Sequence, residues 1–244
     1  STSSGNAPAA GGPNLDSDAR PWATAIVFQP DGNSSNQHIW NSGEGTGSTD
    51  DNIYLRLDAS GNLFFGWGRS GAVNECVIGA GFNAGAGINQ FWGVYIAHNG
   101  TRLSGTDATA SNLAECFDIR IMNNQGGTWQ IAGAGGSFAD SVGNRSTVTN
   151  WSRSGSSMGG RMDRTVGGDF TIGGRGANRS FHGKVASMVI TTLRRSHFMP
   201  DATEIEMMIT DPKQWEQDYR IGQIVRTATG GGNTGYNPEG VANG

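Results

Sequence analysis

The amino-acid sequence predicts an all-β fold, and three observations lead to that prediction. Glycine accounts for 40 of the 244 residues, about twice its usual share of roughly 7%, which favours many tight turns. Lysine, a residue that favours helices, occurs only at Lys184 and Lys213. Short runs in which apolar and polar residues alternate recur along the chain, and this period of two is typical of half-buried strands.

The expected strands are separated by short turns. The clearest hairpin joins 53–57 to 63–67, because Ile53, Leu55 and Leu57 alternate with polar residues before Asp58-Ala-Ser-Gly61 turns the chain. Further strands are expected at 23–29, 37–41, 73–78, 91–98, 116–122 and 130–131. Residues 132–168 have no regular apolar pattern, so no strand is predicted there.

Residues 169–190 predict two further strands, the first ended by Gly173-Gly174. In the second strand, strict alternation places Phe181, Gly183, Val185, Ser187 and Val189 on one face. The opposite face begins with His182 and Lys184 and ends in apolar residues. We therefore expect this strand to begin at a solvated rim and to continue under cover.

A short helix is expected near the end of the chain. Asp201 and Glu204 have the spacing of a capping box, and Ile205, Met208 and Ile209 share one helical face before Asp211-Pro212. The expected organisation is an arm or linker over 1–20, one domain over 21–226 with a helical segment at about 200–222, and a Gly/Asn-rich linker over 227–244 to a further, absent region.

The charge pattern excludes some partners. A net charge of −4 argues against a nucleic-acid partner, and no run of 18 apolar residues exists that would span a membrane. Six arginines lie in Gly/Ser-rich sequence, namely Arg145, Arg153, Arg161, Arg164, Arg175 and Arg179. They are either solvated loop residues or a patch for anionic sugars or an acidic partner.

Cysteine and histidine show no metal-site or nucleophile signature. Cys76 and Cys116 lie in strand-like runs, and they either pair as a disulfide or stay as two buried free thiols.

The order of these motifs resembles the concanavalin A-like superfamily, specifically the laminin-G-like or pentraxin-like jelly roll. The resemblance covers 22–193 and includes an opening strand at 22–28, the hairpin 53–67 and an aromatic-led strand at 91–100. It also includes the Ile-Gly-Gly and Phe-x-Gly-x-Val motifs between Phe170 and Val185. It implies an all-β, concanavalin A-like (laminin-G-like) β-sandwich jelly roll with one short C-terminal helix.

Glucanases of this fold place paired carboxylates on one strand in a Glu-x-Asp-x-x-Glu pattern, which this sequence lacks. The nearest approach, Glu115 and Asp118, has the wrong parity for one face. The segment Asp201–Pro212 resembles the tail of laminin-G-like domains in bacteriophage structural proteins. These resemblances imply a non-enzymatic recognition or structural module of a larger virion, extracellular or cell-surface protein. Its expected partners are other subunits of that assembly, as a homo-oligomer, and glycans bound through loops at one end of the sandwich.

Two alternatives remain open at this point: a glycoside hydrolase or lyase on the same fold, and a domain that only contacts neighbouring subunits. Trp151, with Asn150 and Arg153, is the first candidate for stacking on a sugar, and Trp40 is the second. Packing is the competing interpretation for both tryptophans. The resemblance also implies calcium as the only cofactor candidate, because members of that family often bind it. Its ligands would be Asp50, Asp51, Asp31 and Asp140, which are alternatively turn caps.

Overall fold

The structure is a computed structural model that describes residues 22–32, 35–43, 52–69, 72–79, 81–83, 85–88, 90–99, 116–125, 127–131, 151–154, 169–174, 179–192 and 200–220. The chain divides into two compact units, Ser1–Met199 and Pro200–Gly244. The assignment of 21–226 to a single domain between two linkers stays a prediction.

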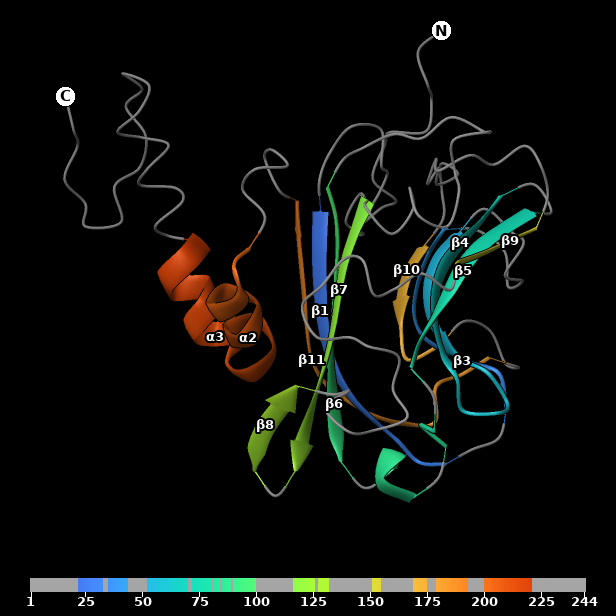
Figure 1. The fold of residues 1–244 in the computed structure, drawn as a ribbon, viewed down its shortest axis with the longest axis horizontal. Helices are drawn as coiled ribbons and strands as arrows, with labels where there is room; N and C mark the ends of the chain where they lie inside the picture. The colour runs from blue at the N-terminus through green and yellow to red at the C-terminus, as the bar shows by residue number, and fades with distance from the viewer. Residues whose placement is uncertain are drawn as a thin grey trace, which may run out of the picture. The chain divides into compact units, whose positions relative to one another are not determined.

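The first unit contains two antiparallel sheets (Figure 1). The five-stranded sheet has the order β11 (Gly183–Thr192), β1 (Trp22–Pro30), β6 (Phe91–His98), β7 (Phe117–Gln125) and β8 (Thr128–Ile131). The six-stranded sheet has the order β10 (Asp169–Ile172), β2 (Gln37–Gly43), β3 (Asn52–Leu57), β4 (Leu63–Arg69), β5 (Ala72–Gly79) and β9 (Trp151–Ser154). A turn of 3-10 helix, η1 (Gly85–Gly87), precedes β6. The predicted all-β sandwich is confirmed.

Strand β9 lies inside the stretch for which the sequence predicted no strand. Its sequence, Trp-Ser-Arg-Ser, contains no alternating apolar pattern. It pairs with β5, where Trp151 lies opposite Cys76 and Ser154 opposite Val73. Pairing with a distant strand, rather than a local pattern, therefore makes these residues a strand.

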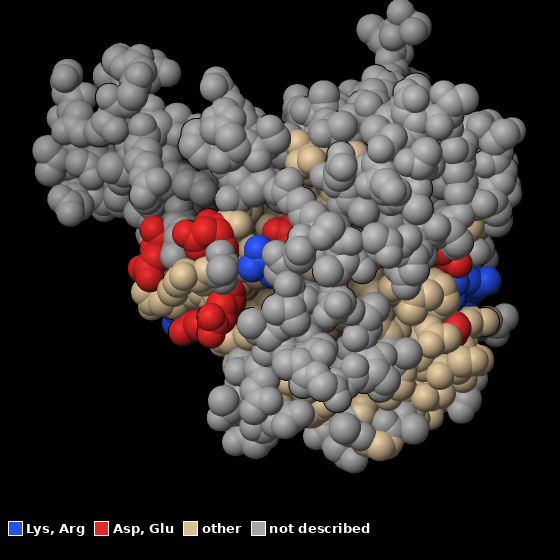
Figure 2. All heavy atoms as spheres, viewed as in Figure 1, with Lys and Arg blue, Asp and Glu red and all other residues tan. Residues whose placement is uncertain are grey.

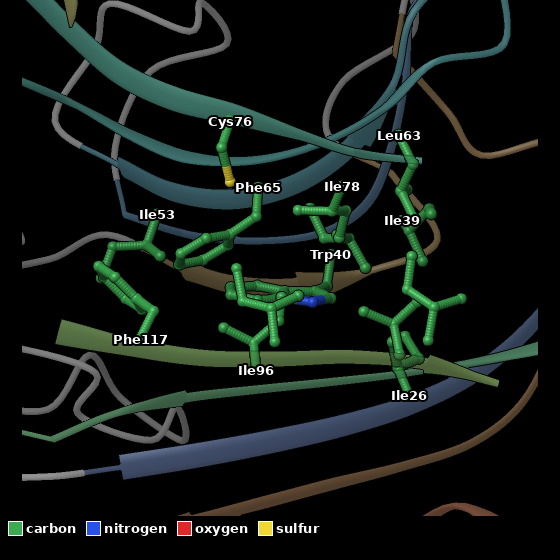
Figure 3. Close-up of a cluster of buried hydrophobic side chains, with 14 of the residues drawn as sticks. Ile26, Ile39, Trp40, Ile53, Leu63, Phe65, Cys76, Ile78, Ile96 and Phe117 are labelled. Carbon is green, nitrogen blue, oxygen red and sulfur yellow. The ribbon is translucent and has the colours of Figure 1, made fainter. Parts of the chain in front are cut away.

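The hydrophobic core lies between the two sheets and is rich in aromatic residues (Figure 3). Phe117 on β7 contacts the opposite sheet, with its ring centroid 5.2 Å from that of Phe65 and 5.5 Å from that of Trp67. The stripe predicted on β7, Phe117, Ile119 and Ile121, is buried as expected. These contacts tie the two sheets together across the centre of the sandwich.

Strand β11 begins at a solvated rim, as predicted, since His182 and Lys184 are exposed. The prediction that its odd-numbered residues share one face is wrong. The register against β1 shifts between Ser187 and Val185, which leaves Ala186 without a partner. This β-bulge reverses the parity of the strand, so Val185, Met188 and Ile190 all pack against the core.

The second unit is helical. Helix α2 (Ala202–Thr210) begins where predicted, with Asp201 Oδ1 accepting a hydrogen bond of 2.8 Å from the Glu204 backbone N–H. Ile205, Met208 and Ile209 are buried, as their shared face predicted. Sequence reasoning expected one short helix, but α3 (Pro212–Trp215) and a π-helical turn, η4 (Glu216–Arg220), follow it directly. Asp211 caps α3, because its Oδ1 accepts from Gln214 N at 3.0 Å.

Acidic side chains gather on the helical unit (Figure 2). Helices α2 and α3 are also joined by a side-chain hydrogen bond, in which Trp215 Nε1 donates to Glu204 Oε1 at 3.1 Å. Within the part of the chain that the structure describes, no helix combines the length and apolar character needed to cross a membrane.

Both cysteines are free and buried. Of the two alternatives that the sequence left open, the structure therefore has buried thiols. Burial raises the pKa of the Cys76 thiol well above its ordinary value, and the neighbouring Glu75 carboxylate raises it further.

Candidate functional site on the outer face of the six-stranded sheet

The face of the six-stranded sheet that points away from the core carries a row of polar residues. On β3, Ile53 and Leu55 point into the core, so Tyr54 and Arg56 lie on the opposite, outer face. The strand pairings show which residue lies level with Tyr54 on each of the other strands. The resulting polar row consists of Thr171, Asn41, Tyr54, Gly66 and Glu75, from β10 to β5, and Ser152 is the residue that pairs with Glu75 on β9.

Tyr54 and Glu75 meet although a strand separates them. The residue between them on β4 is Gly66, which has no side chain to keep them apart. Tyr54 Oη donates to Glu75 Oε2 at 2.8 Å. Arg56 Nη2 lies 2.9 Å from the same oxygen and 3.1 Å from Oε1. Both oxygens of the Glu75 carboxylate are therefore engaged.

Solvent is only partly excluded from the cluster of Tyr54, Arg56 and Glu75. Arg56 and Glu75 keep 13% and 15% of their side-chain surfaces exposed, so solvent reaches the ion pair. The Arg56 guanidinium lies 4.1 Å from the centre of the Phe64 ring, a cation–π contact. Burial raises the pKa of the Tyr54 phenol well above its ordinary value, and the Glu75 charge raises it further. Tyr54 therefore acts as a hydrogen-bond donor rather than as a base.

A second row begins with His38, which lies opposite Arg56. The His38 and Tyr54 ring centroids are 5.6 Å apart. Arg179, from the connection between β10 and β11, places Nη1 3.4 Å from His38 Nε2. Because a guanidinium only donates, Nε2 accepts in this contact, and the imidazole proton then sits on Nδ1.

A β-bulge holds Arg179 beside this row. The register between β2 and β3 shifts between His38 and Trp40, which leaves Ile39 outside the pairing. The Ile39 carbonyl instead accepts from Gly173 N at 2.8 Å, and His38 N donates to the Arg179 carbonyl at 3.1 Å. The connection that carries Arg179 is thus fastened to β2 at two backbone positions.

Several polar atoms in these rows have unused hydrogen-bonding capacity. Asn41 is fully buried, and neither its Oδ1 nor its Nδ2 meets a partner among the described residues. The same is true of Thr171 Oγ1 and Arg56 Nε within that part of the chain. An unsatisfied buried polar group costs roughly 1–3 kcal/mol. The residues His38, Asn41, Tyr54, Arg56, Glu75 and Arg179 are called the outer-face site below.

The aromatic residues singled out from the sequence lie elsewhere. Trp40 has no exposed surface and belongs to the core cluster, so it is a packing residue and cannot stack on a sugar. Trp151 and Arg153 are on β9 rather than in a loop, opposite Cys76 and Asn74. Their side chains, and the whole of Asn150, lie outside what the structure describes. Their predicted roles stay predictions.

The carboxylates singled out from the sequence are also dispersed. Asp118 is on the five-stranded sheet, where its Oδ2 is 3.3 Å from Arg120 Nη2, and Glu115 lies outside the described residues. Of the four calcium candidates, the structure describes Asp31, which is exposed, whereas Asp50, Asp51 and Asp140 lie outside its description. No group of three metal-binding side chains occurs among the described residues. The calcium site stays a prediction.

Sequence reasoning missed the outer-face site. A signal for it was present, because Tyr54 and Arg56 occupy the polar positions of the clearest predicted hairpin. Nothing local connects them to Glu75 or Arg179, which become neighbours only through strand order and the β2 bulge.

Comparison with known proteins gives weak similarities. No family model and no curated protein matches the chain. Among solved structures, the carbohydrate-binding module CBM40 of the Ruminococcus gnavus IT-sialidase, bound to α2,3-sialyllactose, is 10% identical, with 79% of this chain and 84% of that chain covered and a TM-score of 0.35.

Two other solved structures have comparable similarity. The enzymatically active domain of tailspike protein 2 from bacteriophage CBA120 is 15% identical, with 78% of this chain and 24% of that chain covered and a TM-score of 0.38. A SAP-like pentraxin from Limulus polyphemus is 13% identical, with 70% and 64% covered and a TM-score of 0.31. At this level of similarity they assign no function. The order and pairing of the strands define the first unit as a jelly-roll β-sandwich.

Proposed function

We propose that this chain is a non-enzymatic recognition module that binds a glycan at the outer-face site. The observation that carries the proposal is Asn41, a fully buried amide with no partner for either polar atom among the described residues. It lies directly opposite Tyr54 and Thr171 in the polar row. Buried polar groups are rarely left unsatisfied, so such a group points to a ligand that completes it.

The chemistry of the open groups suits a sugar. Asn41 offers one acceptor and two donor hydrogens, Thr171 a hydroxyl and Arg56 its Nε–H. Neighbouring sugar hydroxyls both donate and accept, so a single ring can satisfy several of these groups at once. Arg56 and Glu75, in the same site, keep part of their side-chain surfaces exposed to solvent.

The state of Glu75 supports binding rather than hydrolysis. Glycoside hydrolysis uses a pair of carboxyl groups separated by roughly 5–9.5 Å. Glu75 has both oxygens occupied by Tyr54 and Arg56. Its role in this arrangement is to hold Tyr54 and Arg56 in place for a ligand.

We place this module in a larger virion or extracellular protein, as one subunit of a homo-oligomer. The support for this part of the proposal is the resemblance of 22–193 to laminin-G-like sandwiches and of Asp201–Pro212 to the tail of such domains in bacteriophage structural proteins. The earlier expectation placed glycan binding in loops at one end of the sandwich. The outer-face site now replaces those loops as the proposed contact.

The test replaces the unsatisfied amide by an apolar side chain of similar size. Removing an unsatisfied polar group is expected to be neutral or stabilising. Asn41→Leu should therefore leave the free energy of unfolding within about 1 kcal/mol of the parent, or raise it, while glycan binding falls at least tenfold. Asn123→Leu is the matched control, because Asn123 is a buried asparagine on the other sheet. It should leave glycan binding unchanged.

Binding is measured on a glycan array with the full chain, and the glycans retained there are then used in titrations with both variants. Absence of binding to every glycan would overturn the proposal, as would unchanged binding by Asn41→Leu. Incubating the full chain with the retained glycans and analysing the products by mass spectrometry separates binding from catalysis. Products of hydrolysis or elimination that Glu75→Gln abolishes would favour the glycoside hydrolase or lyase alternative.

A further inference from the structure

We propose that the glycan bound at the outer-face site carries an anionic group, a carboxylate or a sulfate, and that Arg179 binds this group. The inference rests on the proposed function, since it names the class of sugar that the same site selects. It follows from the charges of the described residues in the outer-face site and from the way in which the chain fixes Arg179.

The charges of the outer-face site do not cancel. Glu75 neutralises Arg56 through the ion pair at 2.9 Å. Arg179 contacts His38 at 3.4 Å between Nη1 and Nε2, a contact in which the guanidinium can only donate. Neither ion pair between described residues, Arg56–Glu75 or Arg120–Asp118, includes Arg179. The described part of the site thus has one surplus positive charge in a chain whose net charge is −4.

Arg179 is held in place by the backbone. Its carbonyl accepts from His38 N, and the connection that carries it is closed by a bridge between Gly174 and Ser180. Gly174 has φ +126°, and a Cβ added there would lie 2.4 Å from Ser180 Cα. A side chain at 174 would therefore force the bridge apart. A guanidinium positioned in this way before the ligand arrives loses less entropy on binding.

The geometry of Arg179 suits an anion with several oxygens. One nitrogen, Nη1, faces His38. A guanidinium has five N–H donors in one plane, so the remaining donors can bind two oxygens of a carboxylate or sulfate side by side. His38 also contacts the Tyr54 ring, which places Arg179 next to the polar row. We expect one ligand to use its hydroxyls on Asn41 and its acidic group on Arg179.

The experiment uses the full chain and matched oligosaccharides. One pair ends in glucuronic acid or glucose, and the other differs only by a sulfate on one hydroxyl. We expect the parent to bind the anionic member of at least one pair tenfold or more tightly, and this preference should shrink as salt rises. Arg179→Gln should bring the ratio between the affinities for the anionic and the neutral member close to one. Arg120→Gln, on the other sheet, is the matched control and should keep the preference.

The outcomes separate this inference from the proposed function. Equal binding of the charged and neutral members by the parent protein overturns the inference and leaves glycan binding intact. A preference that survives Arg179→Gln also overturns it, because the selecting charge then lies elsewhere. No binding to any member of either pair, or to any array glycan, overturns both. The comparison of the sugars on the parent protein needs no variant, so misfolding of Arg179→Gln leaves the inference testable.

Discussion

Tyr54 shows how a single residue of the sandwich depends on its neighbours across the sheet. Its hydroxyl reaches Glu75 because Gly66 lies between them, and Arg56 reaches the same carboxylate from the same strand. Each of these groups lowers the free-energy cost of burying the others. The phenol is buried with an acceptor, and the carboxylate is balanced by a guanidinium.

The first prediction concerns this hydrogen bond. Tyr54→Phe should lower the free energy of unfolding by about 1.5–3 kcal/mol, because a bond to a charged acceptor is lost. Urea unfolding of Tyr54→Phe, Glu75→Gln and the double variant measures the coupling between the two side chains. We expect the double variant to lose less than the sum of the single losses. Strictly additive losses would show that the bond contributes nothing.

The second prediction concerns alkaline pH. Burial keeps Tyr54 and Cys76 protonated in the folded chain at pH values where the unfolded chain ionises them, about 10 for Tyr and 8.5 for Cys. The unfolded state then binds fewer protons than the folded state. The free energy of unfolding is therefore unaffected by these groups below about pH 8 and falls as the pH rises further.

Urea midpoints between pH 7 and 10.5 test this dependence. Cys76→Ala lowers stability at every pH, because it leaves a cavity, but it also removes one of the two titrating groups. Between pH 8.5 and 10, the free energy of unfolding of Cys76→Ala should fall less steeply than that of the parent, by up to about 1.4 kcal/mol per pH unit. If the stability of the two proteins falls equally with pH, the Cys76 thiol does not contribute to the pH dependence.

At the scale of elements, two β-bulges decide which residues face the core. The bulge at Ile39 turns both Ile39 and Trp40 inward and leaves a carbonyl to hold the connection that carries Arg179. The bulge at Ala186 reverses the parity of β11. A strand without its bulge would present the alternate set of side chains to the ligand or to the core.

The third prediction concerns the connection between β10 and β11. Gly174→Ala combines a positive φ with a close approach to the Ser180 backbone, so it should destabilise the chain by about 2 kcal/mol or more and weaken glycan binding. Gly81→Ala is the control, because Gly81 has φ +80° but a Cβ there would meet nothing within 4 Å. It should cost about 1 kcal/mol and leave binding unchanged. Equal effects on binding would argue against the positioning role of Gly174.

The fourth prediction concerns the start of α2. Asp201→Ala removes the side-chain acceptor for Glu204 N and should destabilise the helix by about 1 kcal/mol. Hydrogen exchange of the amides in 202–210 should become about fivefold faster. Thr203→Ala, at an exposed position of the same helix, is the control and should not accelerate exchange. Unchanged exchange in Asp201→Ala would show that the cap does not limit fraying.

At the scale of the sandwich, stability depends on aromatic contacts between the sheets. Phe117 touches Phe65 and Trp67 on the opposite sheet, and it also packs on Trp22 and His98 of its own sheet. No disulfide reinforces this packing among the described residues, since Cys76 and Cys116 are free.

The fifth prediction tests whether the two sheets unfold as one unit. Phe117→Ala should lower the free energy of unfolding by about 3–5 kcal/mol, because it leaves a cavity between the sheets. Tryptophan fluorescence and far-ultraviolet circular dichroism should still give a single, coincident transition. Ile172→Ala is the control, because that side chain is 50% exposed, and it should change stability by less than about 0.5 kcal/mol. Two separate transitions within the sandwich would show that the sheets are independent.

Elements whose signals are local could be predicted from the amino-acid sequence alone. The hairpin around Asp58–Gly61, the strand 91–98 and the cap at Asp201 follow from alternation, turn residues and helix-start chemistry, and they occur where predicted. Contacts between distant segments instead determine the burial of Trp40, the change of parity in β11 at Ala186 and the strand that contains Trp151. The outer-face site also depends on contacts between distant segments. Tyr54, Glu75 and Arg179 are far apart in sequence, and side chains on different strands become neighbours through strand order and register, which no local pattern encodes.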